Sequence, residues 1–291
     1  MPKLNILVAF PYFKQQVIDI IKDLDPNEFR LIVDSGAFTA YNTGRAIDID
    51  EYCKFLKSLP KDWNYHAVQL DVYGDPEQTY INFLKMKELG FDVMPVFTRG
   101  DTLERLEEFY QHTDYIMFGG IVVGGENKNY VKWFCENNKG RKAHWLGFVN
   151  TDFIRKYKPE SVDSSTVFGT QRFGWLYIAT GHGALPTIHK TEFAKRPPQW
   201  VMDGLKKVGC TMNDIRLLGQ KEAWTGGSSK YIKDKSTIKA HANLIGVKSH
   251  VYRAIEVEKH LGTKIYLACG NAEQIKLLTM AFNELKERNC I

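Results

Sequence analysis

Three aspartates stand where short apolar runs give way to turn-forming residues: Asp34 in LIVDSGAF, Asp71 in AVQLDVYG and Asp163 in ESVDSS. In a barrel of alternating strands and helices, the carboxyl ends of the strands meet at one mouth, so carboxylates at those ends can face a single substrate. Two such carboxylates can act without a metal, because one transfers a proton while the other attacks an electrophilic carbon. Cleavage of a glycosidic bond uses such a pair.

Each aspartate also has a simpler interpretation. Asp34 before Ser-Gly and Asp71 before Gly74 are typical of turns, and Asp163 before two serines is typical of a helix cap. Residue type alone leaves both interpretations open for each position. The joint occurrence of three such aspartates, each at the end of a predicted strand, favours a shared site.

The apolar runs predict the elements that would position these residues. Strand-like runs occur at 5–10, 30–34, 66–71, 92–97, 115–121, 144–149, 160–163 and 264–269. Most are separated by segments whose apolar residues recur at three- and four-residue spacing, as in amphipathic helices. Eight such alternations predict an α/β fold, a (β/α)8 TIM-like barrel that spans residues 1–291 as a single domain.

The alternation breaks once, between the seventh and eighth predicted strands. Residues 168–262 form a predicted insertion, and residues 189–264 contain 15 Lys/Arg against 7 Asp/Glu in a chain whose net charge is +5. Clustered positive charge with interleaved aromatic residues suits a nucleic acid, although a solvated surface would look similar. The candidate phosphate contacts are Lys206, Lys207, Arg216, Lys230, Lys233 and Lys235.

Composition argues against several other classes. The five cysteines are scattered and odd in number, which favours neither a disulfide framework nor a zinc knuckle, and the histidines form no familiar ligand motif. We therefore expect no metal and no cofactor. No apolar stretch is long enough to cross a membrane, so we expect a cytoplasmic protein with an uncleaved N-terminus.

Several short motifs follow one another in a recognisable order. They are DSGAF (34–38), FGGIVVGG (118–125), HWLGFV (144–149) and VDSS (162–165), followed by QRFG (171–174). Together they resemble the signature elements of the guanine transglycosylases, barrel enzymes that exchange a guanine in a nucleic acid for a 7-deazaguanine base. The resemblance covers residues 34–174, roughly half of the chain.

The resemblance implies a role for each matching residue. Asp163 would be the nucleophile that captures the anomeric carbon, and Asp34 would be the acid/base that serves the departing and arriving bases. Asp71 would accept hydrogen bonds from the guanine-like edge of the base. The other implied substrate-binding residues are Ser35 after Asp34, Phe38 stacking on the base, Gly119 and Gly120 whose backbone lies against it, Ile121 through its backbone, and Arg172 on the phosphate or ribose side.

Some of these positions have structural alternatives of their own. Gly119 and Gly120 could serve tight strand packing, Phe38 could belong to the core, and Arg172 could be an ordinary surface arginine. The spacing of Arg172, nine residues after Asp163, is what favours its functional role.

Departures from the family pattern indicate which branch the chain resembles. It lacks the CxCxxC-type zinc cluster of the tRNA enzymes, reads PVFTRG where a glutamine motif is expected, and has Gly124 and Gly125 before Glu126. Without a zinc subdomain it is more similar to the phage and bacterial enzymes that modify DNA. We therefore expect a monomer whose partners are DNA and a free 7-deazaguanine, in the host cytoplasm if phage-encoded. A tRNA enzyme, a base glycosylase and a nucleic-acid-binding barrel remain alternatives.

Overall fold

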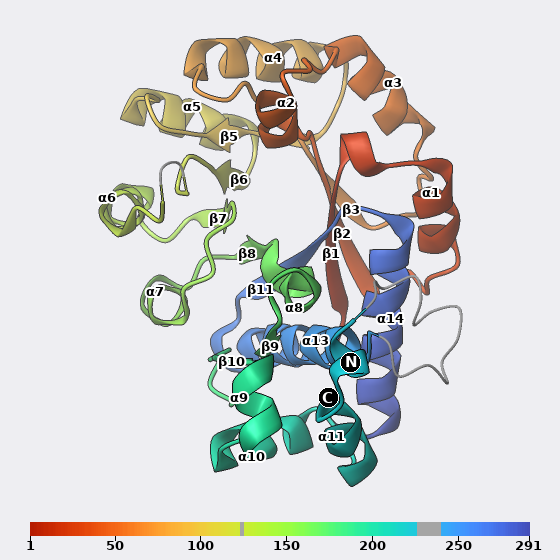
Figure 1. Cartoon of the computed structure of the whole chain (residues 1–291). Helices are drawn as coiled ribbons and strands as arrows, with labels where there is room; N and C mark the ends of the chain where they lie inside the picture. Colours follow the sequence, from red (N-terminus) through yellow and green to blue (C-terminus); the bar gives the residue numbers. More distant parts are fainter. Residues whose placement is uncertain (123–124, 226–239) are drawn as a thin grey trace.

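The computed structural model describes residues 1–122, 125–225 and 240–291, except for the side chains of Gln171 and Arg172. Within these residues the fold is mixed α/β, with helices around a nearly closed, barrel-like parallel sheet (Figure 1). Its strands are β1 (Leu4–Ala9), β2 (Phe29–Asp34), β3 (Tyr65–Val68), β4 (Val93–Met94), β5 (Val96–Phe97), β6 (Tyr115–Phe118), β7 (Lys142–Trp145), β8 (Ser161–Ser164) and β11 (Lys264–Cys269). The predicted α/β class is confirmed.

The order of the strands explains how the sheet comes close to closing. It runs β4-β3-β2-β1-β11-β8-β7-β6-β5, so its two edge strands, β4 and β5, are consecutive in the chain and separated only by Pro95. Proline lacks a backbone N–H and cannot donate to a ladder, which accounts for a break inside the predicted run 92–97. The Pro95 carbonyl still accepts a 2.8 Å bond from Met117 N.

Helices follow most strands and cover the outside of the sheet. They are α1 (Gln15–Lys22), α2 (Ala37–Thr43), α3 (Ile49–Ser58), α4 (Pro76–Glu88), α5 (Leu103–His112), α6 (Lys128–Asn138), α7 (Thr151–Tyr157) and α14 (Ala272–Glu287). Several begin at a capping side chain, as where Asp48 accepts bonds from Asp50 N and Glu51 N. None of the helices in the described ranges is long and apolar enough to span a bilayer.

Strand alternation divides the apolar residues into two layers. On β1, Ile6 and Val8 belong to the core between the sheet and the helices, whereas Leu7 belongs to a smaller cluster inside the sheet with Ile32 and Tyr266. Both faces of β1 are therefore covered, and its burial pattern is continuous.

The chain between β8 and β11 contains the predicted basic segment. Its elements are α8 (Gly169–Phe173), β9 (Trp175–Tyr177), β10 (Thr187–His189), α9 (Lys190–Lys195), α10 (Gln199–Lys207), α11 (Met212–Leu218) and α13 (His241–Leu261). Helix α13 packs against β11, α14 and β9, and its residues 241–251 are all buried. Lys248 on this helix pairs with Glu284 on α14. Part of the basic segment is therefore core, which excludes Lys248 as a surface cation.

Candidate active site

The three aspartates lie at the carboxyl ends of their strands. Asp34 is the last residue of β2, Asp163 lies within β8, and Asp71 comes three residues after β3 ends at Val68. Because the strands are parallel, these ends point the same way. The charges of Asp71 and Asp163 both contribute to raising the pKa of Asp34, as expected for carboxylates that share one end of the sheet.

Asp34 has the electrostatic setting of an acid/base group. Its Oδ2 accepts a 3.0 Å bond from Gly36 N. Burial, with smaller contributions from the charges of Asp71 and Asp163, raises the pKa of Asp34 to about 7. A carboxyl with such a pKa can both give and take a proton near neutral pH.

Asp71 is linked to Asp34 through Ser35, the residue that directly follows Asp34 in the chain. Ser35 is fully buried, donates a 2.7 Å bond from its Oγ to Asp71 Oδ1, and accepts a bond from Ala37 N. Burial raises the pKa of Asp71, while the bond from Ser35 lowers it. The structure thus places Ser35 against Asp71, where it fixes the carboxylate, rather than in open space.

Asp163 has two nitrogen neighbours on the same oxygen. Its Oδ1 accepts a 2.7 Å bond from Gly147 N and lies 3.1 Å from His144 Nε2. The side chain is almost buried, and the described residues give Oδ2 no hydrogen bond. One oxygen is therefore held in place while the other is left for chemistry.

The two glycines after β6 are explained by protein packing. Gly119 N donates to Phe97 O at 2.8 Å, and a Cβ on Gly119 would meet Val96 at 3.3 Å. Gly120 has φ +71°, and a Cβ there would lie 3.1 Å from both Arg99 Cγ and Thr98 Oγ1. The alternative of close strand packing therefore accounts for both positions, and their contact with a base stays a prediction.

The next residue of this motif is also held by the protein. Ile121 is fully buried, and its carbonyl accepts a 3.0 Å bond from Asn127 N. That carbonyl is therefore already engaged, and a backbone contact from Ile121 to a base stays a prediction.

Gly120→Ala should destabilise the fold by about 2 kcal/mol, because it adds both left-handed backbone strain and a clash. Gly44→Ala is the matched control, since Gly44 has φ +65° but no atom within 4 Å of its added Cβ. Urea unfolding of both variants separates the two effects. Equal losses of stability would show that the contact with Arg99 and Thr98 is unimportant.

Three aromatic rings lie together at the helix that follows Asp34. Phe38 and Tyr41, both on α2, are 59% and 61% exposed, which excludes the core alternative for Phe38. Tyr73 lies between them, with ring centroids 5.9 Å from Phe38 and 4.2 Å from Tyr41. Tyr41 and Tyr73 were not among the predicted site residues. The signal that could have identified Tyr41 was its three-residue spacing from Phe38, which puts both side chains on one helix face.

The predicted cations are dispersed. Lys206 and Lys207 are exposed at the end of α10, and Arg216 is exposed on α11, where it donates to Asn213. Figure 1 shows α10 and α11 at the opposite end of the molecule from α2, the helix that follows Asp34. Lys230, Lys233 and Lys235 lie outside the described residues, as does the side chain of Arg172 on α8. Contact of these residues with a nucleic acid stays a prediction.

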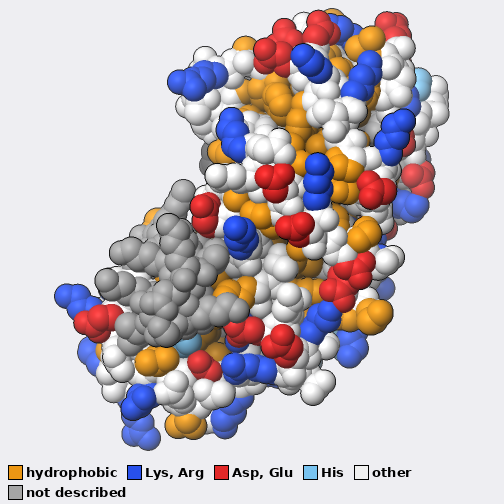
Figure 2. All heavy atoms as spheres, turned by 90° about the vertical axis from the view of Figure 1, so that its right-hand side faces the viewer, with side chains coloured by type: hydrophobic (Ala, Val, Ile, Leu, Met, Phe, Trp, Pro, Cys, Tyr) orange, Lys and Arg blue, Asp and Glu red, His pale blue; other side chains and the backbone are white. Residues whose placement is uncertain are grey.

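Charge on the visible surface is mixed. On the face seen in Figure 2, Lys and Arg side chains alternate with Asp and Glu, with apolar patches between them. The described part of this face therefore offers no single positive patch, and any polyanion contact would involve separated cations.

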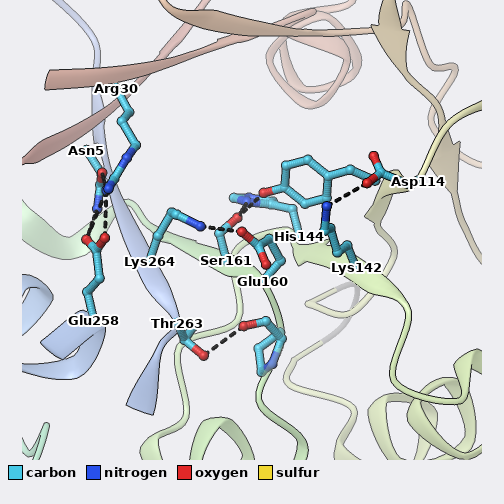
Figure 3. Close-up of polar contacts among 12 residues, drawn as sticks. Asn5, Arg30, Asp114, Lys142, His144, Glu160, Ser161, Glu258, Thr263 and Lys264 are labelled. Carbon is cyan, nitrogen blue, oxygen red and sulfur yellow. Dashed lines mark hydrogen bonds and ion pairs between the residues drawn. The ribbon is translucent and has the colours of Figure 1, made fainter. Parts of the chain in front are cut away.

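Two further sets of polar residues were not foreseen. Burial raises the pKa of Asp101 to about 6, and its Oδ2 accepts a 2.8 Å bond from Thr98 N. This bond gives Asp101 a structural role, because it caps the loop that lies beside Gly120. The other set is a buried chain of Tyr115, Ser161 and His144 beneath Asp163, parts of which are shown in Figure 3.

The described residues contain no group of three or more His, Cys, Asp or Glu side chains that could hold a metal ion. Comparisons with protein-family models, curated proteins and solved structures found no significant match.

Proposed function

We propose that this chain is a DNA-guanine transglycosylase, which exchanges guanine in DNA for a free 7-deazaguanine base. One observation carries the proposal: Asp34, with a pKa of about 7, lies within electrostatic reach of Asp163, whose Oδ1 accepts from Gly147 N and lies 3.1 Å from His144 Nε2. Two neighbouring carboxyl groups in unlike environments can divide the roles of acid/base and nucleophile.

The proposed architecture is a (β/α)8 TIM-like barrel. In this view β4 and β5 are one strand interrupted at Pro95, and the insertion 168–262 lies between the seventh and eighth strands, β8 and β11. The position of the aspartates agrees with it, since active sites of such barrels lie at the carboxyl ends of the strands.

The reaction would proceed in two displacements. Asp163 Oδ2 attacks C1′ of the deoxyguanosine, the C1′–N9 bond breaks, and Asp34 gives its proton to the departing guanine. This leaves a deoxyribosyl ester on Asp163 and a carboxylate on Asp34. The incoming base then loses its N9 proton to Asp34, and N9 attacks C1′ to release Asp163. Both carboxyl groups return to their starting states, so the exchange consumes no other reactant.

Base recognition would use the groups around this pair. Asp71, which accepts a hydrogen bond from Ser35, would accept hydrogen bonds from the amide and amino edge of a guanine-like base. The exposed rings of Phe38 and Tyr41, with the half-buried ring of Tyr73 beside them, suit stacking on an extruded nucleotide or its unpaired neighbour. Arg172 on α8, the helix that follows Asp163, remains the proposed phosphate-side residue.

Nucleoside mass spectrometry tests the choice of substrate. Duplex DNA and tRNA are each incubated with the protein and 7-cyano-7-deazaguanine, digested, and analysed for the modified nucleoside. We expect the deoxynucleoside from DNA and no ribonucleoside from tRNA. The opposite result would assign a tRNA enzyme, and abasic sites without a new base would assign a glycosylase.

A further inference from the structure

A buried hydrogen-bonded chain leads from the interior of the sheet to Asp163. Tyr115 Oη lies 2.5 Å from Ser161 Oγ, which lies 2.5 Å from His144 Nδ1, and His144 Nε2 lies 3.1 Å from Asp163 Oδ1. Ser161 and His144 are fully buried, and Tyr115 is nearly so. Figure 3 shows His144 and Ser161 side by side inside the sheet.

The arrangement of protons in this chain selects one histidine tautomer. If the Tyr115 hydroxyl donates to Ser161, the Ser161 hydroxyl can donate to His144 Nδ1, and the remaining ring proton on Nε2 points at Asp163. Every proton then has an acceptor. With the proton on Nδ1, the bare Nε2 would face Asp163 Oδ1, so that two acceptors would lie 3.1 Å apart with no proton between them.

Packing holds the ring of His144 in this orientation. Pairing of β7 with β8 places His144 opposite Ser161, and pairing of β8 with β11 places Asp163 opposite Tyr266. The His144 ring meets the edge of Tyr266 with centroids 5.8 Å apart. A buried imidazole with one neighbour on each nitrogen and an aromatic ring against it has little freedom to rotate.

We propose that His144 is a positioning residue for the nucleophile, a deduction that rests on the proposed function. As the Nε2–H tautomer it holds Asp163 Oδ1 together with Gly147 N, so that Oδ2 is the oxygen presented to the sugar. Ser161 and Tyr115 act one step further away by fixing the tautomer. Such outer partners orient a reactive group without touching the substrate.

Variants at His144 test this role through kinetics. His144→Leu should lower the rate of base exchange about 100-fold while changing the KM of the free base less than about threefold, because only the attacking group is disturbed. His144→Gln keeps an N–H donor and should recover at least about tenfold of the loss. His250→Leu is the matched control, since His250 is also buried but packs against Tyr177 on β9. A normal rate for His144→Leu would overturn the proposal.

A spectroscopic measurement tests the tautomer without any activity. In ¹⁵N-detected spectra, the ring signals of His144 are those present in the wild type and absent from His144→Gln. In the wild type these signals should show the proton on Nε2. In Ser161→Ala the same ring should be a mixture of the two tautomers. A proton on Nδ1 in the wild type would overturn the proposal. If the wild type exchanged no base while its His144 showed the expected tautomer, the proposed function would fail and the positioning of Asp163 would stand.

Discussion

Asp163→Asn should lower the rate of guanine exchange by at least about 1000-fold, because a neutral amide cannot form the ester that carries the sugar between bases. The fold should be retained, since an asparagine oxygen can still accept from Gly147 N. Single-turnover release of guanine from duplex DNA measures the effect directly, without interference from product dissociation.

Asp152→Asn is the control for this substitution. Asp152 lies on α7, its side chain is 90% exposed, and it pairs only with Arg155 among the described residues. Its replacement removes one carboxylate at the surface, where an ion pair contributes little. Exchange by Asp163→Asn at a rate within twofold of this control would contradict the role assigned to Asp163.

Asp34→Asn should have two opposite effects, a loss of activity and a gain of stability. The rate should fall about 100- to 10,000-fold, because the amide can neither give nor take the proton of the base. Stability should rise at pH 8, because the substitution removes a charge that burial and Asp71 disfavour. A residue that is costly to the fold yet required for turnover is characteristic of an active site.

The sign of the pH dependence follows from the direction of the pKa shift. The pKa of Asp34 is about 7 in the folded protein against 3.8 for the unfolded reference, so the folded state binds the extra proton between these values. The contribution of Asp34 to stability therefore falls as the pH rises from about 4 to about 7, by at most about 4 kcal/mol. The advantage of Asp34→Asn should grow over the same range and level off above it.

Urea unfolding at pH 5 and at pH 8 measures this difference. Asp152→Asn again serves as the control and should show no comparable change between the two values. An Asp34→Asn protein whose stability follows that of the wild type at both pH values would show that Asp34 ionises normally, and the acid/base assignment would lose its basis.

The strands could be read from the sequence where turn residues bound an apolar run. β11 occupies its predicted range because Gly262 and Gly270 flank it. The run 66–71 was predicted too long, since β3 ends at Val68. Gln69 Nε2 donates to Thr79 O on α4, and Asn82 Nδ2 on the same helix donates to Leu70 O, so this part of the run serves the turn. Such contacts between distant residues leave no periodic signal.

The site could be predicted in part for the same reason. Asp34, Asp71 and Asp163 were visible because each directly follows or ends an apolar run. The bond between His144 and Asp163 depends on the register of β7 against β8, which a single sequence does not state. Strand alternation could have placed His144 on the inner face of the sheet, opposite to Trp145. It could not have identified Asp163 as the partner of His144.

Incorporation of ¹⁵N-labelled guanine into unmodified duplex DNA tests the central claim most directly. If a sugar–Asp163 ester forms reversibly, free guanine must re-enter the DNA, whatever 7-substituent the natural base carries. We predict labelled deoxyguanosine in nucleoside digests from the wild-type protein and none from Asp163→Asn. Absence of label with the folded wild type, or its persistence in Asp163→Asn, would contradict a base exchange that proceeds through Asp163.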